Sequence, residues 1–299
     1  MSKLATWMLA AFILMVADAG ELRAEPELDA SQIVEKNVAA RGGLEAWRKI
    51  QTMVWVGHIE SENAPGPSLP FVLELKRPDK TRFEIKAQNQ MSIRIFDGTH
   101  GWKLRPARNG QPEVQPYTAE ELSFAQNGNG IDGPLMDFHA KGIAVTLDGI
   151  DEIEGHKAYR LSVKLPSGVS HHVWIDAQTF LEVKYDRESR NAFGMTGTVS
   201  VFYRNYQAIE GLQIPLLLET GAGAAKAMDK MVIDRIVLNP ALDDRTFAKP
   251  AAPWHRNAAS VDLASPRVLR SIPAWSGGAQ QSGSGHVAGS FSTQTSGTQ

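Results

Sequence analysis

Eight histidines have the widest range of possible chemistry in this sequence, since imidazole binds metals and transfers protons near neutral pH. His171 and His172 are adjacent in a segment with strand-like alternation, so their side chains are expected to point to opposite faces and not to share one ion. The chain has no cysteine to complete a zinc site. Four further histidines lie without ligand spacing: His58, His100, His139 and His156. We therefore predict no metal site.

Hydrolase chemistry needs a nucleophile, a base and an orienting acid in one geometry. The chain has no Gly-x-Ser-x-Gly motif, and Ser167 precedes a glycine in a turn signal. The carboxylates of Asp151, Glu152 and Glu154 cluster near a strand end, where a solvated hairpin explains them. The glycine-rich run 221–225 lacks the Lys-Ser/Thr pair of a phosphate loop. We therefore predict a protein that is not an enzyme and uses no cofactor.

Residues 1–19 have the pattern of a secretory signal peptide. Lys3 supplies the positive start, residues 4–16 are apolar, and Ala17-Asp18-Ala19 matches an A-x-A cleavage site. An uncleaved membrane anchor is the alternative, but residues 4–16 at ~1.5 Å each are too short for a bilayer core of about 30 Å. We predict cleavage of the leader and a periplasmic location.

Composition limits the domain count and the partners. The formal net charge is −2 and no basic stripe is present, which argues against nucleic acid as a partner. Strand signals run evenly with no linker between residues 51 and 240, so residues 25–250 are expected to form one domain. Residues 251–299 are rich in Gly, Ser, Thr and Gln, a composition typical of a disordered tail.

The central part of the chain is a series of segments in which apolar and polar residues alternate. Because successive side chains in a strand point to opposite faces, this pattern predicts one large sheet with an apolar face and a polar face. Charged residues such as Glu74, Arg82 and Glu84 are assigned to the solvated face. A sheet of this size must close, curl around other elements or hold a ligand.

An amphipathic helix is predicted over residues 29–49, before the first strand. Asp29 or Ser31 is suited to cap its start, and apolar residues follow at helical spacing. Gly42 and Gly43 interrupt the pattern, which indicates a helix, a break and a short second turn. Its apolar side is expected to lie on the apolar face of the sheet.

A second helical stretch is predicted within residues 118–142. Thr118 lies three residues before Glu121, which is a capping-box pattern. The run Asn-Gly-Asn-Gly at 127–130 is expected to act as a hinge. We expect this stretch to form a movable lid over the sheet, with the following lid residues: Leu122, Phe124 and Phe138.

Apolar side chains of the strands are candidates to line a cavity for acyl chains. They are Trp55, Phe71, Leu73, Phe83, Ile85, Ile93, Val173, Ile175, Tyr185, Val199 and Val201. The alternative is a dry, filled core, because protein interiors are normally close-packed. Arg41 is a candidate to meet an anionic headgroup at the cavity mouth, and equally a candidate to end the first helix.

Several short motifs in a fixed order carry a family resemblance. They are Ala39-Ala40-Arg41-Gly42-Gly43-Leu44-Glu45-Ala46-Trp47, Asp97-Gly98, Gly101-Trp102, Asp137-Phe138, residues 155–161, residues 174–179, Gly211-Leu212, Ile214-Pro215 and Leu238-Asn239-Pro240. Over about residues 29–250 the chain resembles the outer-membrane lipoprotein-sorting (LolA-like) family. The resemblance implies a mainly β (α+β) fold, an incomplete antiparallel barrel with helices over its open face, and a cavity that holds acyl chains. The chain is longer than the family's lipoprotein carriers through added strands and its tail.

Two functions from different classes follow. The first is a monomeric periplasmic carrier or chaperone that holds lipid or lipoprotein acyl chains and passes them to a membrane complex or receptor. The resemblance also implies the second, an envelope sensor or protein-interaction module of the same fold with a filled core. A carrier binds lipid and an interaction module with a filled core does not, so lipid binding distinguishes them.

Overall fold

The computed structural model describes residues 28–61, 68–87, 90–106, 112–128, 130–190, 196–222 and 229–251. All of them belong to the first of two compact units, Met1–Ser260 and Val261–Gln299. The predicted signal peptide at 1–19 and the predicted tail beyond residue 251 lie outside the described residues.

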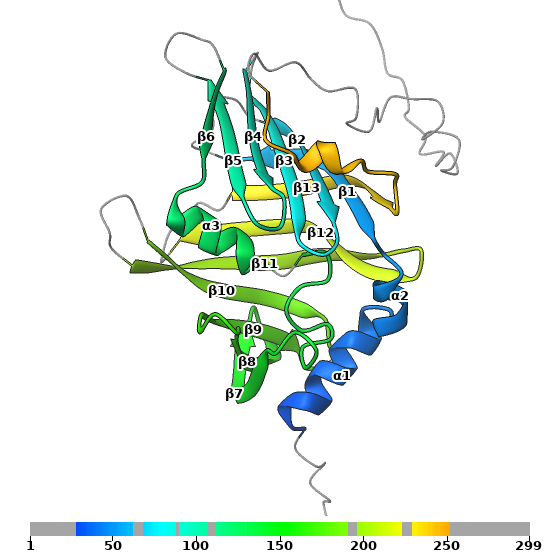
Figure 1. The fold of residues 1–299 in the computed structure, drawn as a ribbon. Coiled ribbons are helices and arrows are strands. Elements are labelled where there is room, and N and C mark those ends of the chain that lie inside the picture. Colours follow the sequence, from blue (N-terminus) through cyan, green and yellow to red (C-terminus); the bar gives the residue numbers. More distant parts are fainter. Residues whose placement is uncertain are drawn as a thin grey trace, which may run out of the picture. The chain divides into compact units, whose positions relative to one another are not determined.

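The described strands form one antiparallel sheet of 13 strands (Figure 1). They are β1 (Thr52–Glu60), β2 (Leu69–Lys76), β3 (Lys80–Ala87), β4 (Gln90–Phe96), β5 (Gly101–Pro106), β6 (Pro112–Pro116), β7 (Ala144–Ile153), β8 (His156–Lys164), β9 (Ser170–Asp176), β10 (Glu182–Arg190), β11 (Thr196–Ile209), β12 (Leu212–Ala222) and β13 (Asp229–Leu238). Their order is β6-β5-β4-β3-β2-β1-β13-β12-β11-β10-β9-β8-β7. Since β6 and β7 are the two edges and do not pair, the sheet is open, which confirms the predicted incomplete barrel.

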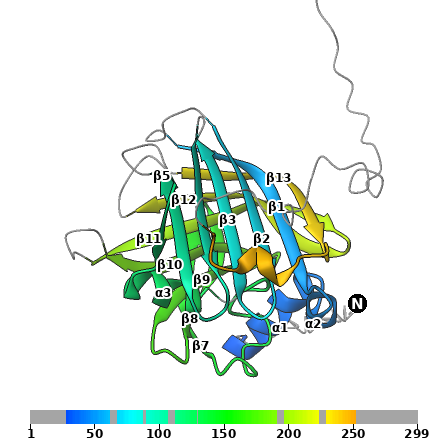
Figure 2. The same cartoon turned by 45° about the horizontal axis from the view of Figure 1, so that its top comes forward.

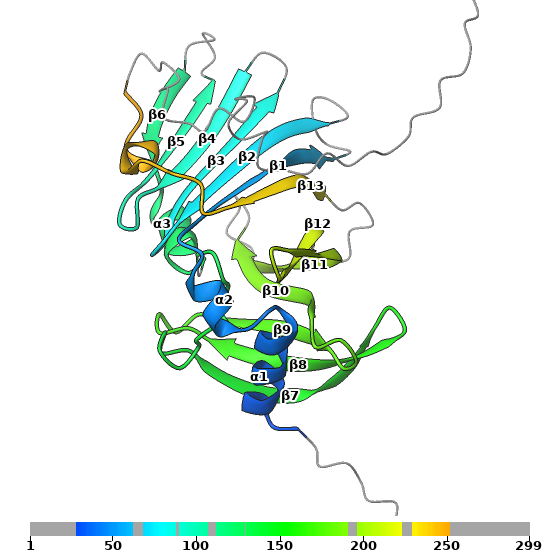
Figure 3. The same ribbon diagram turned by 90° about the vertical axis from the view of Figure 1, so that its right-hand side faces the viewer.

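The chain passes from one edge of the sheet to the other through residues 117–143, here called the crossing segment. Strands β1 to β6 run outward from the middle of the sheet, and β7 to β13 return from the opposite edge to pair with β1. The crossing segment contains helix α3 (Ala119–Gln126). Figure 3 shows the sheet curving around the face that carries the helices. We call this the inner face.

Helix α1 (Ala30–Ala40) is capped by Asp29, one of the two predicted caps, in a capping box in which Asp29 and Gln32 each bind the backbone of the other. Gly42 and Gly43 then have φ values of 109° and 89°, a left-handed conformation that favours glycine. A Cβ atom on Gly42 would lie 2.5 Å from the Gly211 carbonyl oxygen. Helix α2 (Leu44–Arg48) follows, so the predicted helix, break and second turn are confirmed.

Two apolar clusters hold the helices and the crossing segment against the inner face. Ile33 and Val34 of α1 pack with residues of β8 and β9 in the first cluster. Trp47 of α2 packs with residues of β1, β2 and β12 in the second. The crossing segment contributes Leu135 to the first cluster and Met136 to the second, and both side chains are fully buried. This part of the crossing segment is therefore core.

Part of the outer face is buried, although the alternation predicted that this face is solvated. Glu74, Arg82 and Glu84 are buried there, and Arg82 forms ion pairs with both carboxylates. The Arg82 guanidinium also donates a hydrogen bond of 3.1 Å to the carbonyl oxygen of Thr246. Thr246 belongs to the 3-10 helix η1 (Asp244–Phe247), which lies over β2 and β3 (Figure 2). A short element that follows the last strand therefore covers this part of the outer face.

Candidate functional site

Two cavities lie side by side on the inner face. Cavity 1 has a volume of about 250 Å³ and lies between α2, the crossing segment and strands β9 to β12. Cavity 2 has a volume of about 420 Å³ and lies between α3 and strands β2 to β4. Phe124, Gly128 and Gly130 line both cavities, so the two meet beneath the C-terminal end of α3. Ligand pockets typically hold about 300–1,000 Å³, so the pair is large enough for an extended ligand.

Five of the predicted cavity residues line these spaces. Trp55, Val173 and Tyr185 line cavity 1, and Leu73 and Phe83 line cavity 2. Strand pairing brings further predicted residues to the same face, because cross-strand partners share a face. Val201 pairs with Tyr185, and the buried Ile175 joins the first apolar cluster. The remaining predicted residues on this face line neither cavity: Phe71, Ile85 and Val199.

The pairing of β3 with β4 corrects the expected position of Ile93. Ile93 pairs with Glu84, whereas Phe83 pairs with Arg94. Ile93 therefore lies on the outer face, where it is fully buried, and it does not face either cavity. The inner position on β4 belongs to the cation Arg94.

Helix α3 borders both cavities, and of the three predicted lid residues Phe124 lines them. The Phe124 side chain is 54% exposed even though it lines both cavities, and the Arg187 guanidinium lies 4.5 Å from its ring centre. Leu122 is half-buried and lines neither cavity. Phe138 packs against the first apolar cluster, so the structure places it in the core and not on the lid.

Glu121 attaches α3 to the sheet. Its carboxylate accepts hydrogen bonds from Lys103 at 2.8 Å and from Arg94 at 3.1 Å, and it completes the predicted capping box with Thr118. Burial alone would raise the pKa of Glu121. The Lys103 ammonium, the Thr118 backbone N–H and the charge of Arg94 outweigh that effect and lower the pKa to about 2. No residue of α3 is buried, so these contacts and Phe124 hold the helix in place.

Arg41 lies in the wall of cavity 1 and ends helix α1, so it has the capping position that the sequence predicted. It is buried, with an ion pair of 3.2 Å to Glu182 and a hydrogen bond of 3.1 Å to the Asp132 carbonyl oxygen. Its guanidinium also lies 4.5 Å from the ring centre of Trp47. Its role towards a headgroup stays a prediction.

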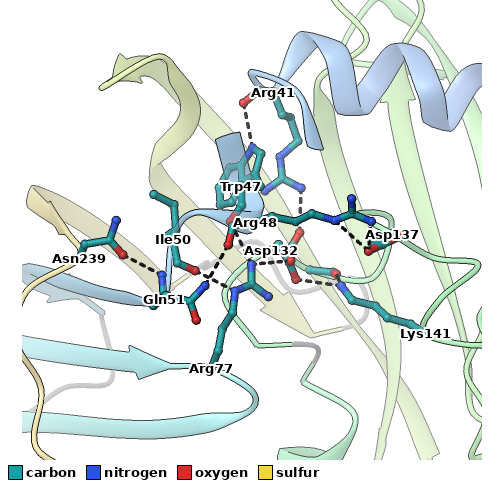
Figure 4. Close-up of polar contacts among 11 residues, drawn as sticks. Arg41, Trp47, Arg48, Ile50, Gln51, Arg77, Asp132, Asp137, Lys141 and Asn239 are labelled. Atoms are coloured by element: carbon teal, nitrogen blue, oxygen red, sulfur yellow. Dashed lines mark hydrogen bonds and ion pairs between the residues drawn. The ribbon is translucent and has the colours of Figure 1, made fainter. Parts of the chain in front are cut away.

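A charge cluster that the sequence patterns did not predict fixes the rest of the crossing segment (Figure 4). Asp132 forms ion pairs of 2.7 Å with Arg77 and 2.8 Å with Lys141. The Arg77 guanidinium also donates to the carbonyl oxygens of Ile50 and Trp47. These contacts join α2, the turn after β2 and the crossing segment at one point.

The wall of cavity 1 formed by β9 to β11 carries polar side chains. The Tyr206 hydroxyl donates a hydrogen bond of 2.9 Å to the backbone carbonyl oxygen of Glu182. Burial raises the pKa of Tyr203 and Tyr206, and it raises the pKa of Tyr185 to about 12, so all three stay neutral. Burial, followed by the nearby charges of Arg187 and His172, lowers the pKa of His171. Cavity 1 thus offers neutral hydrogen-bonding groups beside apolar ones.

Within the described ranges, no group of three or more histidine, aspartate or glutamate side chains is arranged to hold a metal ion. No helix among these residues is both long and apolar enough to span a membrane. The geometry of the cavities suits binding of an elongated, largely apolar molecule.

No protein-family model and no curated protein matches the sequence. Among solved structures, the chain is similar to a LolA superfamily protein from Nitrosomonas europaea, with 16% identity, coverage of 75% of this chain and 99% of that chain, and a TM-score of 0.48. It is also similar to a domain named for outer membrane lipoprotein sorting from Vibrio parahaemolyticus, with 12% identity, coverage of 74% and 96%, and a TM-score of 0.48. The open antiparallel sheet described above is the fold that the resemblance of the sequence motifs implies.

Proposed function

We propose that this protein binds acyl chains of a lipid or lipoprotein in cavities 1 and 2 and acts as a periplasmic carrier or chaperone without catalysing a reaction. The supporting observation is the pair of adjacent cavities on the inner face beside a helix that has no buried residue. Burying an acyl chain contributes ~0.8 kcal/mol per CH₂, so an apolar cavity binds such a chain without specific polar contacts.

Cavity 2 has the lining that an acyl chain requires. Leu73, Leu75, Phe83 and Met231 line it from the sheet, and Ala125 lines it from α3. Of the charged groups that line it, Arg94 and Glu121 form an ion pair, and Asp79 is exposed. An apolar chain in this space therefore meets no buried unpaired charge, which favours binding.

In this proposal the part of the crossing segment that opens is α3, whereas the sequence predicted a lid over residues 118–142. Residues 131–136 are held by the two apolar clusters and by the Asp132 charge cluster. Among the described residues, helix α3 contacts the rest of the fold through Glu121 with β4 and β5, through Phe124 with Arg187, and through its C-cap Asn127, which accepts a hydrogen bond from Ser167. Because none of these α3 residues is buried, α3 can move away from the sheet while the rest of the segment stays packed.

The experiment is a titration of delipidated mature protein with a fluorescent fatty acid, using two matched tryptophan substitutions in α3. Ala125 lines cavity 2, whereas Ala119 is exposed and lines neither cavity. Ala125→Trp is expected to weaken binding at least about tenfold, because the indole excludes two or more methylene groups at ~0.8 kcal/mol each. Ala119→Trp is expected to bind as the unsubstituted protein does. Equal affinities for all three proteins would place the ligand elsewhere and contradict the proposal.

The interaction-module alternative requires an interior without space for a lipid. Cavities 1 and 2 support the carrier instead, because a close-packed interior has few voids larger than a water molecule. If the delipidated protein takes up no acyl probe, the alternative replaces the carrier.

A further inference from the structure

His171 is a buried polar group that the fold itself does not explain. It belongs to β9, is 6% exposed and lines cavity 1. Neither of its ring nitrogens has a hydrogen-bond partner among the described residues. The neighbouring His172 points to the other face, where it is half exposed and lies 3.4 Å from Asp148. The two adjacent histidines therefore have opposite environments.

A buried imidazole without partners destabilises the fold, because its polar atoms lose their hydrogen bonds to water. The structure gives no compensating contact. The ring centre of His171 lies 5.1 Å from that of Tyr185, and this aromatic contact leaves the nitrogens unpaired. Since burial lowers the pKa of His171, the ring is neutral near pH 7 and offers one donor and one acceptor. Such a group is suited to a ligand oxygen in cavity 1.

The charges around His171 indicate which oxygen is favoured. Arg187, which acts on His171 electrostatically, forms no ion pair with any residue that the structure describes. Arg41 also lies in the wall of cavity 1, and its buried Nε atom has no hydrogen-bond partner among the described residues. Glu182, the acidic group of this cavity, is already paired with Arg41. The surroundings are therefore rich in donors and positive charge, which favours an electron-rich acceptor oxygen.

The two cavities thus differ in chemistry. Cavity 1 contains His171, Arg41 and tyrosine side chains, whereas cavity 2 is lined mainly by aliphatic and aromatic groups. Building on the proposed function, we propose that His171 donates a hydrogen bond to the carbonyl oxygen of an acyl group in cavity 1, while the hydrocarbon chain runs past Phe124 into cavity 2. A free fatty acid and an acyl ester share this carbonyl chemistry.

The test compares three ligands of equal chain length, namely laurate, methyl laurate and dodecane, by displacement of a fluorescent acyl probe from the mature protein. His171→Phe keeps an aromatic ring and removes the hydrogen bond, and His171→Gln keeps a donor. His172→Phe is the matched control on the other face of the same strand. We expect His171→Phe to weaken laurate and methyl laurate about tenfold, the effect of one lost hydrogen bond, and to leave dodecane unchanged. His171→Gln is expected to restore most of the affinity, and His172→Phe to change nothing.

The outcomes distinguish the proposed acyl binding from the proposed His171 contact. If His171→Phe weakens the binding of both laurate and methyl laurate, the result supports a contact to the carbonyl oxygen. If it weakens the binding of laurate alone, the result supports the same site with a free carboxylate as its ligand. If His171→Phe leaves laurate binding unchanged, or weakens dodecane as much as laurate, the His171 contact is overturned while acyl binding stands. If the unsubstituted protein binds none of the three ligands, the proposed function fails and this inference fails with it.

Discussion

Arg77 and Asp132 form an ion pair of 2.7 Å between the turn after β2 and the crossing segment, and Asp132 is only 5% exposed in its side chain. The same carboxylate pairs with Lys141 at 2.8 Å. One aspartate therefore neutralises two cations and fixes the crossing segment beside the cavities. Because this contact holds residues 131–136 and Lys141 in place, α3 is the part of the crossing segment that we propose to move.

Asp132→Asn is expected to lower the free energy of unfolding by about 3 kcal/mol, because it leaves two partly buried cations without their partner. Urea denaturation followed by circular dichroism measures this change. Glu45→Gln is the matched control, since Glu45 pairs with Arg48 but is 79% exposed. The control is expected to cost less than about 1 kcal/mol. Equal effects of the two substitutions would show that the Asp132 cluster does not hold the crossing segment.

Arg41 and Glu182 are expected to be strongly coupled, because both are largely buried and pair at 3.2 Å. Arg41→Met alone should cost about 3 kcal/mol, since it leaves the Glu182 carboxylate uncompensated. Combining it with Glu182→Gln should recover a large part of that loss. A double-mutant cycle on the free energy of unfolding measures the coupling. Additive effects of the two substitutions would mean that the pair does not act as a unit.

The attachment of α3 is expected to weaken in acid. The folded pKa of Glu121 is lowered to about 2 from an ordinary value near 4.5, so its stabilising contribution is fully present above pH 4.5 and is lost as the pH falls towards 2. Hydrogen exchange of the α3 amides, corrected for the intrinsic pH dependence of exchange, should show falling protection over this range. Glu121→Gln should remove most of this pH dependence, and Glu120→Gln, with an exposed side chain, should keep it. Unchanged protection down to pH 2 would exclude Glu121 as the attachment.

Phe124 is expected to control how fast a ligand leaves, since it lies where the two cavities meet. Phe124→Ala should make dissociation about tenfold faster, because losing the phenyl contact with an acyl chain costs on the order of 1.4 kcal/mol. Phe124→Leu keeps an apolar side chain and should stay close to the original rate. Stopped-flow transfer of a fluorescent fatty acid to vesicles measures the rate. A rate that is unaffected by Phe124→Ala would remove this residue from the ligand path.

Local patterns were sufficient to predict several elements of the fold. The alternating segments predicted the sheet, Gly42-Gly43 predicted the break after α1, and Thr118 with Glu121 predicted the start of α3. Each of these features is determined by neighbouring residues. Sequence reasoning from such residues is therefore reliable for periodicity and helix caps.

Features that depend on distant contacts were not predicted. Ile93 and Phe83 both lie in alternating strands, but only the pairing of Phe83 with Arg94 shows that they occupy opposite faces. The alternation assigned Arg82 and Glu84 to solvent, whereas η1, more than 150 residues away along the chain, buries them with Glu74. His171 carries no local signal of its environment either. Residues of α2, the crossing segment and strands β10 to β12 line cavity 1 with His171, and these are separate elements of the chain.

Acyl binding itself is tested most directly by native mass spectrometry of the predicted mature chain, from residue 20 onward, exported to a bacterial periplasm and released without detergent. The account predicts additional mass that extracts into organic solvent and fragments as acyl chains, and loss of that mass in Ala125→Trp but not in Ala119→Trp. A bare protein mass, with no uptake of added phospholipid or fatty acid, would contradict it.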